Sequence, residues 1–210
     1  MAVDQRYLDG LIGSRDELSQ FAPLLPHDRD AVLETVRRQP HDPSFARFVE
    51  QVRRAGAELE IVSDGYGFYV EPELATIGVS GVPVYSAVTT WTDEGPSIAF
   101  PNGHPACYVC GTCKRERVLH HKRAGRHTVL VGDGPSDRYA AAHADTIFAK
   151  SLLAGICEQE GWAFRAWTTF GDVAAWLEGQ AMVPDGIAPP VDRPFICGPE
   201  VWGPGRHGPR

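Results

Sequence analysis

Residues 128–150 read TVLVGDGPSDRYAAAHADTIFAK, and this stretch decides the fold that the rest of the chain has to match. Residues suited to a buried strand lead into a Gly-Asp-Gly turn centred on Asp133, and a second carboxylate follows at Asp137. A carboxylate carried out of a buried strand costs stability unless something positive meets it. Two groups can meet it: a metal ion, or the start of the next helix near Arg138.

Strands and helices alternate on both sides of this stretch. Apolar periodicity and turn residues predict helices over 44–56, 68–78, 114–122, 136–144, 151–161 and 170–179, and strands over 57–65, 127–131, 146–149 and 163–167. Ser151 is the expected N-cap of its helix. The alternation predicts the α/β fold class, with a Rossmann-like parallel sheet flanked by helices. A turn signal at Asp93-Glu94-Gly95 predicts a β-hairpin insertion at about residues 84–105.

The two ends of the chain lack this alternation. Residues 1–43 look helical and amphipathic, which predicts a helical segment ahead of an α/β core at 44–180. Residues 181–210 are so rich in proline and glycine that no regular element is expected, and we expect this tail to be disordered.

Composition argues against several classes of protein. The formal net charge of −7 disfavours a general nucleic-acid binder, which would carry a basic face. No apolar run of about eighteen residues and no basic-then-apolar leader occurs, so we expect neither a membrane span nor export. Three of the five cysteines fall within one short segment, which suits a reducing cytoplasm better than a disulfide framework. We therefore expect a cytoplasmic protein, and its composition indicates no oligomeric state.

Candidate site residues lie where predicted strands end, because ligands of a doubly wound sheet collect at that edge. A serine and loop N–H groups bind phosphate oxygens, a lysine supplies positive charge, and strand-end carboxylates hold magnesium. The candidate substrate-binding residues are Ser63, Asp64, Gly65 and Lys114, and the candidate magnesium residues are Asp133 and Asp137. The competing interpretation is that Asp137 caps the helix near Arg138 and that Asp133 accepts loop N–H bonds.

The order of these motifs resembles the haloacid dehalogenase superfamily over roughly residues 10–179. An apolar strand ending at Ser63 matches the second family motif, and the helix-borne Lys114 matches the third. The fourth motif, Gly-Asp-Gly with a further acid four residues on, matches Asp133 and Asp137. The segments VSDGYGFYVEP and CGTCKRE look most like the 2-hydroxy-3-keto-5-methylthiopentenyl-1-phosphate phosphatases of methionine salvage and, more distantly, phosphoserine phosphatases.

The resemblance implies a phosphohydrolase that acts on a small phosphorylated metabolite, with neither nucleic acid nor membrane as a partner. Ser63 and Lys114 would bind the transferring phosphoryl group, and Lys114 and Asp133 would belong to the catalytic machinery. Asp133 would ligate Mg²⁺, and Asp137 would support the metal site from behind. By the same resemblance, residues 1–43 would be the remnant of a helical cap that closes over the substrate and excludes bulk water.

The first motif of the family is not found in these 210 residues. That motif is an apolar strand ending in Asp-x-Asp-Gly-Thr, which supplies the aspartate nucleophile and the general acid. Asp4 and Asp9 have neither this spacing nor an apolar strand before them. We favour the interpretation that about 40 residues of a working enzyme are missing, because a degenerate relative would sooner lose side chains than a central strand. As written, the chain would be inactive. The alternative is a non-catalytic phosphate-binding or regulatory protein.

A cysteine cluster is the basis of a second hypothesis. The segment CYVCGTC places Cys107, Cys110 and Cys113 at equal spacing, with His104 before them. Three thiolates and a histidine would supply the four ligands of a zinc ion, but the usual signature has two separated pairs. We favour reduced thiols packed against the hairpin over structural zinc. A redox role is favoured still less, because a Cys-x-x-Cys couple normally opens a helix directly after a strand.

Overall fold

The computed structural model describes residues 2–105 and 107–179. The tail at 181–210, for which disorder is expected, lies outside the described residues. Across the described part of the chain, no helix combines the length and the apolar character that a bilayer-spanning helix requires.

The described residues divide into two compact units, each built from separate stretches of the chain. The first unit contains residues 2–40 and 60–113, apart from residue 106, and the second contains residues 41–59 and 114–179.

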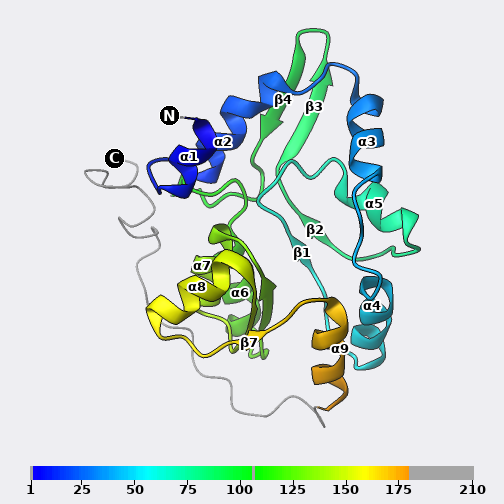
Figure 1. Ribbon diagram of the computed structural model, residues 1–210, viewed down its shortest axis with the longest axis vertical. Helices are drawn as coiled ribbons and strands as arrows, with labels where there is room; N and C mark the ends of the chain where they lie inside the picture. The colour runs from blue at the N-terminus through cyan, green and yellow to red at the C-terminus, as the bar shows by residue number, and fades with distance from the viewer. Residues whose placement is uncertain (1, 106, 180–210) are drawn as a thin grey trace. The chain divides into compact units, whose positions relative to one another are not determined.

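The first unit begins with helices, as predicted for the N-terminal segment (Figure 1). Its helices are α1 (Val3–Leu8), α2 (Ser14–Phe21), the 3-10 helix η1 (Ala22–Leu24), α3 (Arg29–Arg37) and α5 (Val70–Thr76). Helix α2 buries Leu18 and α3 buries Leu33, which accounts for the amphipathic pattern of this part of the sequence. Pro72 lies in the first turn of α5, where its missing N–H costs no helical hydrogen bond.

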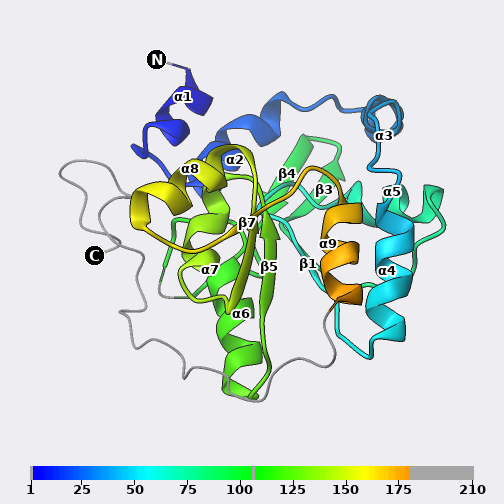
Figure 2. The same cartoon turned by 60° about the horizontal axis from the view of Figure 1, so that its bottom comes forward.

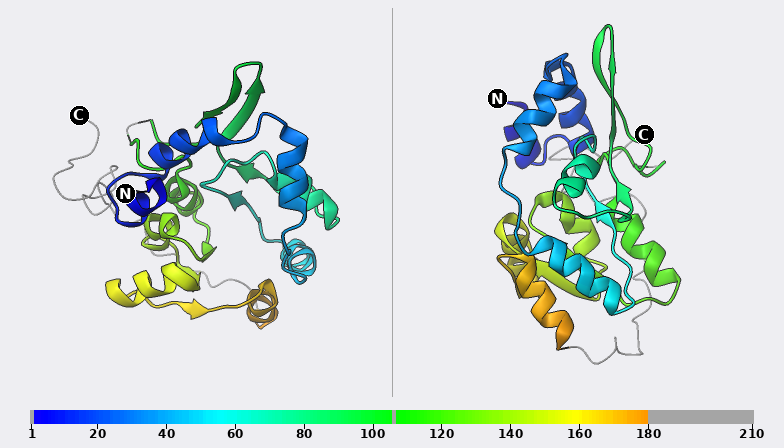
Figure 3. Two further views of the ribbon diagram at one scale, coloured as in Figure 1. Left: turned by 45° about the horizontal axis from the view of Figure 1, so that its top comes forward. Right: turned by 90° about the vertical axis from the view of Figure 1, so that its right-hand side faces the viewer.

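A short parallel pair and a hairpin provide the strands of the first unit. Strand β1 (Ile61–Val62) pairs in parallel with β2 (Val84–Tyr85). Strands β3 (Val88–Thr92) and β4 (Gly95–Ala99) form the antiparallel hairpin, visible as a two-stranded ribbon in Figure 3. The turn lies where Asp93-Glu94-Gly95 predicted it. The expected start of the hairpin near residue 84 is wrong, because residues 84 and 85 pair with β1 instead.

The second unit contains a three-stranded parallel sheet with the order β5-β6-β7. Its strands are β5 (Val129–Gly132), β6 (Thr146–Ala149) and β7 (Arg165–Ala166) (Figure 2). Gly132 lies opposite Ala149 in the register, and Ala149 lies opposite Ala166, so all three strands end at one edge. The predicted parallel sheet flanked by helices is therefore present. The strands that were predicted to form one sheet fall, among the described residues, into two separate parallel sheets, because β1 pairs only with β2.

Helices cover both faces of this three-stranded sheet. They are α4 (Phe45–Arg54), α6 (Lys114–Arg123), the 3-10 helix η2 (Pro135–Asp137), α7 (Arg138–Ala141), α8 (Ser151–Glu160) and α9 (Phe170–Glu178). Helices α4 and α9 lie side by side in Figures 1 and 2, and Phe48 and Val173 pack with Phe148 of β6. The neighbouring Ile147 packs with Leu153 of α8 in a second cluster. Consecutive strand residues point to opposite faces, so each face has its own helices and core.

The start of α8 differs from the sequence prediction. Lys150, not Ser151, is the N-cap residue, and Ser151 is the first helical residue, with a positive φ of 51°. A positive φ is uncommon for a residue other than glycine, so the chain makes a sterically demanding turn between β6 and α8. The turn lies at the carboxyl edge of the sheet, directly after β6.

Candidate functional site

The end of β5 explains the glycine that precedes Asp133. A Cβ atom at Gly132 would lie 2.6 Å from Oδ2 of Asp137, so only glycine leaves room for that carboxylate. Oδ2 of Asp137 accepts the backbone N–H groups of Asp133 and Gly134, both at 3.0 Å. The second acid of the motif therefore folds back on the loop that carries the first, and it is buried there.

Lys114, the first residue of α6, completes this cluster. Its Nζ donates to Oδ1 of Asp137 at 2.7 Å and to Oγ of Ser136 at 3.0 Å. The ion pair is largely shielded from water, since the Lys114 side chain is 14% exposed and that of Asp137 7%. A carboxylate in such a setting is stabilised because both of its oxygens are hydrogen-bonded, one of them to a cation.

The two acids of the motif are used differently. Asp133 is exposed, and within the described residues its side chain has no hydrogen-bond or ion-pair partner. Asp137 makes no side-chain cap bond to α7. Asp137 is the N-cap residue of α7 by position, but the expected side-chain cap of that helix is not formed, and its carboxylate caps η2 instead through the N–H group of Gly134. The side chain of Asp133 accepts no loop N–H bond among the described residues. A fixed, buried acid holds the loop, and a free carboxylate stands at the sheet edge.

The loop after β1 belongs to the first unit and carries the other candidate residues. The N–H group of Ser63 donates to the carbonyl of Tyr85 at 2.8 Å, which continues the pairing of β1 with β2. Oγ of Ser63 accepts the N–H group of Gly65 at 3.2 Å and keeps its own proton for a further acceptor. Binding of a phosphoryl group by Ser63 and Gly65 stays a prediction.

Asp64 has a structural task that the sequence does not reveal. Its Oδ2 accepts the hydroxyl of Ser14 at 2.5 Å, and its Oδ1 accepts the N–H group of Thr112 at 2.9 Å. Oγ of Ser14 accepts the N–H group of Gly111 at 3.3 Å. Asp64 thus connects helix α2, the β1 loop and the segment before α6. Ser14 lies 50 residues before Asp64 and Thr112 lies 48 residues after it, so no local sequence signal could have shown these bonds.

Further ionisable groups surround the β1 loop within the same unit. Burial, then the charges of Asp4 and Asp64, raise the pKa of Glu17. Burial, then Glu17 and Tyr69, raise the pKa of Tyr66 to about 12. The phenol of Tyr66 is therefore protonated at neutral pH, and it donates to the carbonyl of Leu18 at 3.3 Å. This bond is a second connection between α2 and the β1 loop.

The cysteine cluster shows no metal site in the part of the chain that the structure describes. Cys107 is buried, and Cys110 and Cys113 are partly buried. Among residues 2–105 and 107–179 there is no group of three or more His, Cys, Asp or Glu that could hold a metal ion. The structural zinc considered for these cysteines is therefore not supported.

The donor chemistry around Asp133 suits Mg²⁺ better than zinc. Magnesium prefers oxygen ligands and is usually bound by one or two carboxylates together with substrate phosphates and water. Asp133 offers an unpaired carboxylate, whereas both oxygens of Asp137 are engaged. The residues present fit a magnesium ion held by Asp133, with Asp137 fixing the loop behind it.

The Asp-x-Asp spacing of the first family motif occurs once, at Asp28 and Asp30. These residues do not form that motif, because no strand precedes them and they lie at the start of α3. The Asp28 carboxylate is the N-cap and accepts the N–H groups of Asp30 at 3.0 Å and Ala31 at 3.2 Å. The spacing is therefore explained by helix capping.

Comparison with known proteins agrees with the motif resemblance. The family model described as haloacid dehalogenase-like hydrolase matches residues 5–142. A 2-hydroxy-3-keto-5-methylthiopentenyl-1-phosphate phosphatase of Brevibacillus brevis is 29% identical over 181 residues, which is 84% of this chain and 82% of the relative. The enzyme of the same name from Exiguobacterium sibiricum is 29% identical over 175 residues, covering 81% of this chain and 80% of the relative.

Solved structures show the same fold. A probable phosphoserine phosphatase from Vibrio cholerae, in unliganded form, matches with a TM-score of 0.58 and 18% identity, over 84% of this chain and 54% of that one. A structure described as a phospho-aspartyl intermediate analogue of phosphoserine phosphatase matches with a TM-score of 0.58 and 15% identity, over 83% and 82% of the two chains. The family match spans more than half of the sequence and agrees with the second, third and fourth motifs. The chain belongs to the haloacid dehalogenase-like hydrolase family.

Proposed function

We propose that this protein is a magnesium-dependent phosphomonoesterase of the kind named for its relatives, acting on a small, sugar-like phosphate ester such as 2-hydroxy-3-keto-5-methylthiopentenyl 1-phosphate. The observation that carries the proposal is the free Asp133 carboxylate beside the Lys114–Asp137 ion pair. The names of the relatives suggest the substrate class. The proposed setting is the cytoplasm, because three cysteines within one short segment suit a reducing compartment better than a disulfide framework.

Each residue of the second-unit cluster has a task in this proposal. Lys114 places a positive charge where phosphoryl oxygens gain negative charge during transfer. Asp137 keeps that ammonium and the loop N–H groups in fixed positions. Asp133 would hold the magnesium ion, which supplies charge neutralisation at the phosphoryl oxygens when it is bound. Ser63 and the N–H groups of its loop would bind the remaining oxygens.

The nucleophile is the part of the proposal that these 210 residues do not supply. Transfer through a phosphorylated aspartate needs a carboxylate in line with the leaving group. Asp133 is assigned to the metal and Asp137 is buried in its ion pair, so neither is available for attack. We therefore expect the chain as printed to bind metal and phosphate without turnover. Its activity would depend on an aspartate supplied from outside these residues.

Hydrolysis of p-nitrophenyl phosphate with Mg²⁺ tests this reasoning. The 210-residue chain should show only background hydrolysis, and a chain extended upstream by an apolar strand ending in Asp-x-Asp-Gly-Thr should turn over. Asp133→Asn in the extended chain should abolish that activity. Turnover by the 210-residue chain that Asp133→Asn abolishes would show that it contains a nucleophile, and inactivity of both chains would contradict the phosphatase proposal.

Metal binding separates the enzyme proposal from a purely phosphate-binding protein. Mn²⁺, a paramagnetic substitute for Mg²⁺, should broaden the NMR signals of Gly132 and Gly134 in the 210-residue chain, and Asp133→Asn should remove the effect. Phosphate binding without any Mn²⁺ effect would instead favour the non-catalytic binder. Such a binder needs only Lys114, Ser63 and loop N–H groups.

A further inference from the structure

The backbone N–H and carbonyl groups of Asp133 each make a hydrogen bond. Its N–H group donates to Oδ2 of Asp137 at 3.0 Å, and its carbonyl accepts the N–H group of Leu153 at 3.0 Å. Leu153 is a fully buried residue in the first turn of α8. The exposed carboxylate therefore rises from a backbone with little freedom to move.

The residue before Asp133, Gly132, is bound by the side chain of Trp167, which lies at the end of another strand. The indole Nε1 of Trp167 donates to the carbonyl of Gly132 at 3.1 Å. The backbone N–H group of Lys150 donates to the same carbonyl at 3.3 Å. Trp167 directly follows β7, which β6 separates from β5 in the sheet order, so the indole reaches past the middle strand. It ties the two outer strand ends together.

A cation lies over one face of the indole. Nζ of Lys150 lies 3.6 Å from the centroid of the Trp167 ring and 3.4 Å from the carbonyl of Thr168. A lysine ammonium at this distance over a tryptophan face is attracted by the ring. Lys150 is also the residue before Ser151, whose positive φ directs the chain into α8. Both partners of the cation–π pair thus lie at the carboxyl edge.

Trp176 of α9 provides a contrast within the same unit. Its Nε1 is buried and has no hydrogen-bond partner among the described residues. Its ring packs against Phe148 with the centroids 5.4 Å apart. Arg165 lies over the same ring, with its Cζ 5.8 Å from the centroid. Trp176 therefore acts through its ring alone, whereas Trp167 also gives its N–H group to the carbonyl of the residue before Asp133.

We propose that Trp167, held by Lys150, is a positioning residue for Asp133: its indole N–H fixes the Gly132 carbonyl and with it the direction in which the Asp133 carboxylate leaves the sheet. The part of this proposal that concerns magnesium binding by Asp133 rests on the proposed function. The physical effect on the backbone does not depend on it. A metal ligand that is fixed before binding loses less conformational freedom when the ion arrives.

Amide hydrogen exchange tests the backbone effect directly. Trp167→Phe keeps the ring and removes the N–H donor. It should speed exchange at the Asp133 and Leu153 amides about fivefold, the factor that corresponds to one net hydrogen bond. Trp176→Phe removes an N–H group without a partner, so exchange at these amides should change less than about twofold. The Phe148 amide of the middle strand monitors unfolding of the whole unit. Unchanged exchange at Asp133 and Leu153 in Trp167→Phe would overturn the proposal, and so would equal acceleration at Phe148.

Metal affinity gives the second readout. Titration with Mn²⁺ should show about fivefold weaker binding by Trp167→Phe than by Trp176→Phe, again the factor for one net hydrogen bond. Faster exchange with unchanged Mn²⁺ affinity would contradict the positioning of the carboxylate. If the wild-type chain binds no Mn²⁺, the proposed function fails, and the exchange data still decide whether Trp167 fixes the backbone.

Discussion

Asp133 and Asp137 lie four residues apart and carry the same carboxyl group, yet replacing them should have very different effects on stability. Asp137→Asn removes the charge that pairs with the largely buried Lys114 ammonium, and the neutral amide cannot accept as many bonds. We expect the free energy of unfolding to fall by about 2–4 kcal/mol, as when one partner of a largely buried ion pair is lost. Asp133→Asn changes an exposed group that has no partner among the described residues, so its effect should stay within about 0.5 kcal/mol.

Urea unfolding at pH 7 measures both variants against the unchanged chain. The Asp133→Asn variant is the matched control, because it makes the same chemical change in the same loop. A loss of similar size in both variants would contradict the division of labour between the two acids. An unaffected Asp137→Asn variant would show that the Lys114–Asp137 pair does not hold the loop.

At the scale of single residues, the sequence predicted the members of the Lys114, Asp133 and Asp137 cluster but not their roles in holding the fold. The spacing of the motif alone does not show that Asp133 and Asp137 have different roles; only the family resemblance assigned the metal to Asp133 and the supporting position to Asp137. Asp64 and Trp167 show why the rest was out of reach: Asp64 binds Ser14 and Thr112, and Trp167 binds Gly132, all far away in sequence. Side-chain bonds between distant segments leave no periodic pattern to detect.

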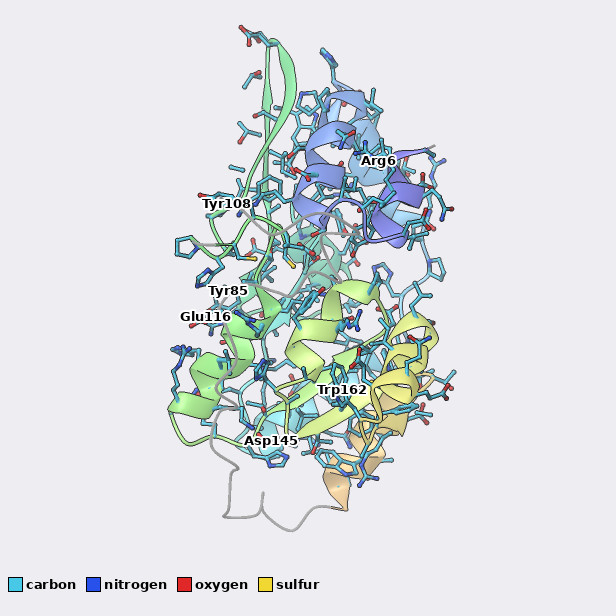
Figure 4. All side chains as sticks on the ribbon, turned by 90° about the vertical axis from the view of Figure 1, so that its left-hand side faces the viewer. Arg6, Tyr85, Tyr108, Glu116, Asp145 and Trp162 are labelled. Carbon is cyan, nitrogen blue, oxygen red and sulfur yellow. The ribbon has the colours of Figure 1, made fainter. Side chains whose placement is uncertain are left out.

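A buried ion pair joins α6 to the start of β6 in the second unit. Lys122 of α6 pairs with Asp145, just before β6, and both side chains are almost fully buried. The other oxygen of Asp145 accepts the N–H and hydroxyl groups of Thr128, just before β5, both at 2.8 Å. Figure 4 labels Asp145 in this unit. One carboxylate therefore connects the end of α6 with the starts of two neighbouring strands.

This connection predicts a pH dependence of stability. Burial alone would raise the pKa of Asp145, but bonds from Lys122 and Thr128 and the charge of Lys122 outweigh it, so the pKa is lowered. A lowered carboxyl pKa contributes stability that is fully present above the ordinary value of about 4 and is lost as the pH falls through the lowered value. Asp145→Asn should therefore cost about 2–4 kcal/mol near pH 7, and the difference from wild type should shrink below about pH 4.

Urea midpoints collected between neutral and acidic pH test this expectation. Asp172→Asn is a suitable control: Asp172 also has a lowered pKa, caused by backbone hydrogen bonds, but lies exposed at the start of α9. Its substitution should alter stability much less at neutral pH. A difference between wild type and Asp145→Asn that stays constant or grows as the pH falls would contradict the argument.

Elements were predicted well where one pattern determines them. Helix α4 and strand β6 match their predicted positions because apolar residues recur on one face or run through a short buried segment. Helix α7 is only Arg138–Ala141, although a longer helix was predicted, because the first residues of that stretch form η2 around the Asp137 carboxylate. Local propensity was overridden there by the loop that presents Asp133.

At the scale of the whole molecule, the sequence predicted the fold class and family but not the division of the strands. A single alternating pattern does not reveal which strands hydrogen-bond to one another. In the described residues β1 and β5 belong to different sheets, and each pairs with one neighbour only. The two units are also interleaved along the chain, so a boundary drawn at one residue could not separate them. Pairing between distant segments has to be observed.

The open edge of β5 predicts how the whole chain behaves at high concentration. No described strand bonds to its outer side, and its Val129 side chain is 40% exposed. An apolar edge strand with unpaired backbone groups is a template for pairing with another chain, and a charge there prevents it. We expect the 210-residue chain to associate as its concentration rises, and Val129→Lys to reduce this association.

Leu152→Lys is the control, since it removes a 55% exposed apolar side chain from α8 without touching an edge. Sedimentation velocity over a range of concentrations would show the difference. Equal effects of the two substitutions would indicate general surface hydrophobicity rather than strand pairing, and no association of the unchanged chain would contradict the prediction.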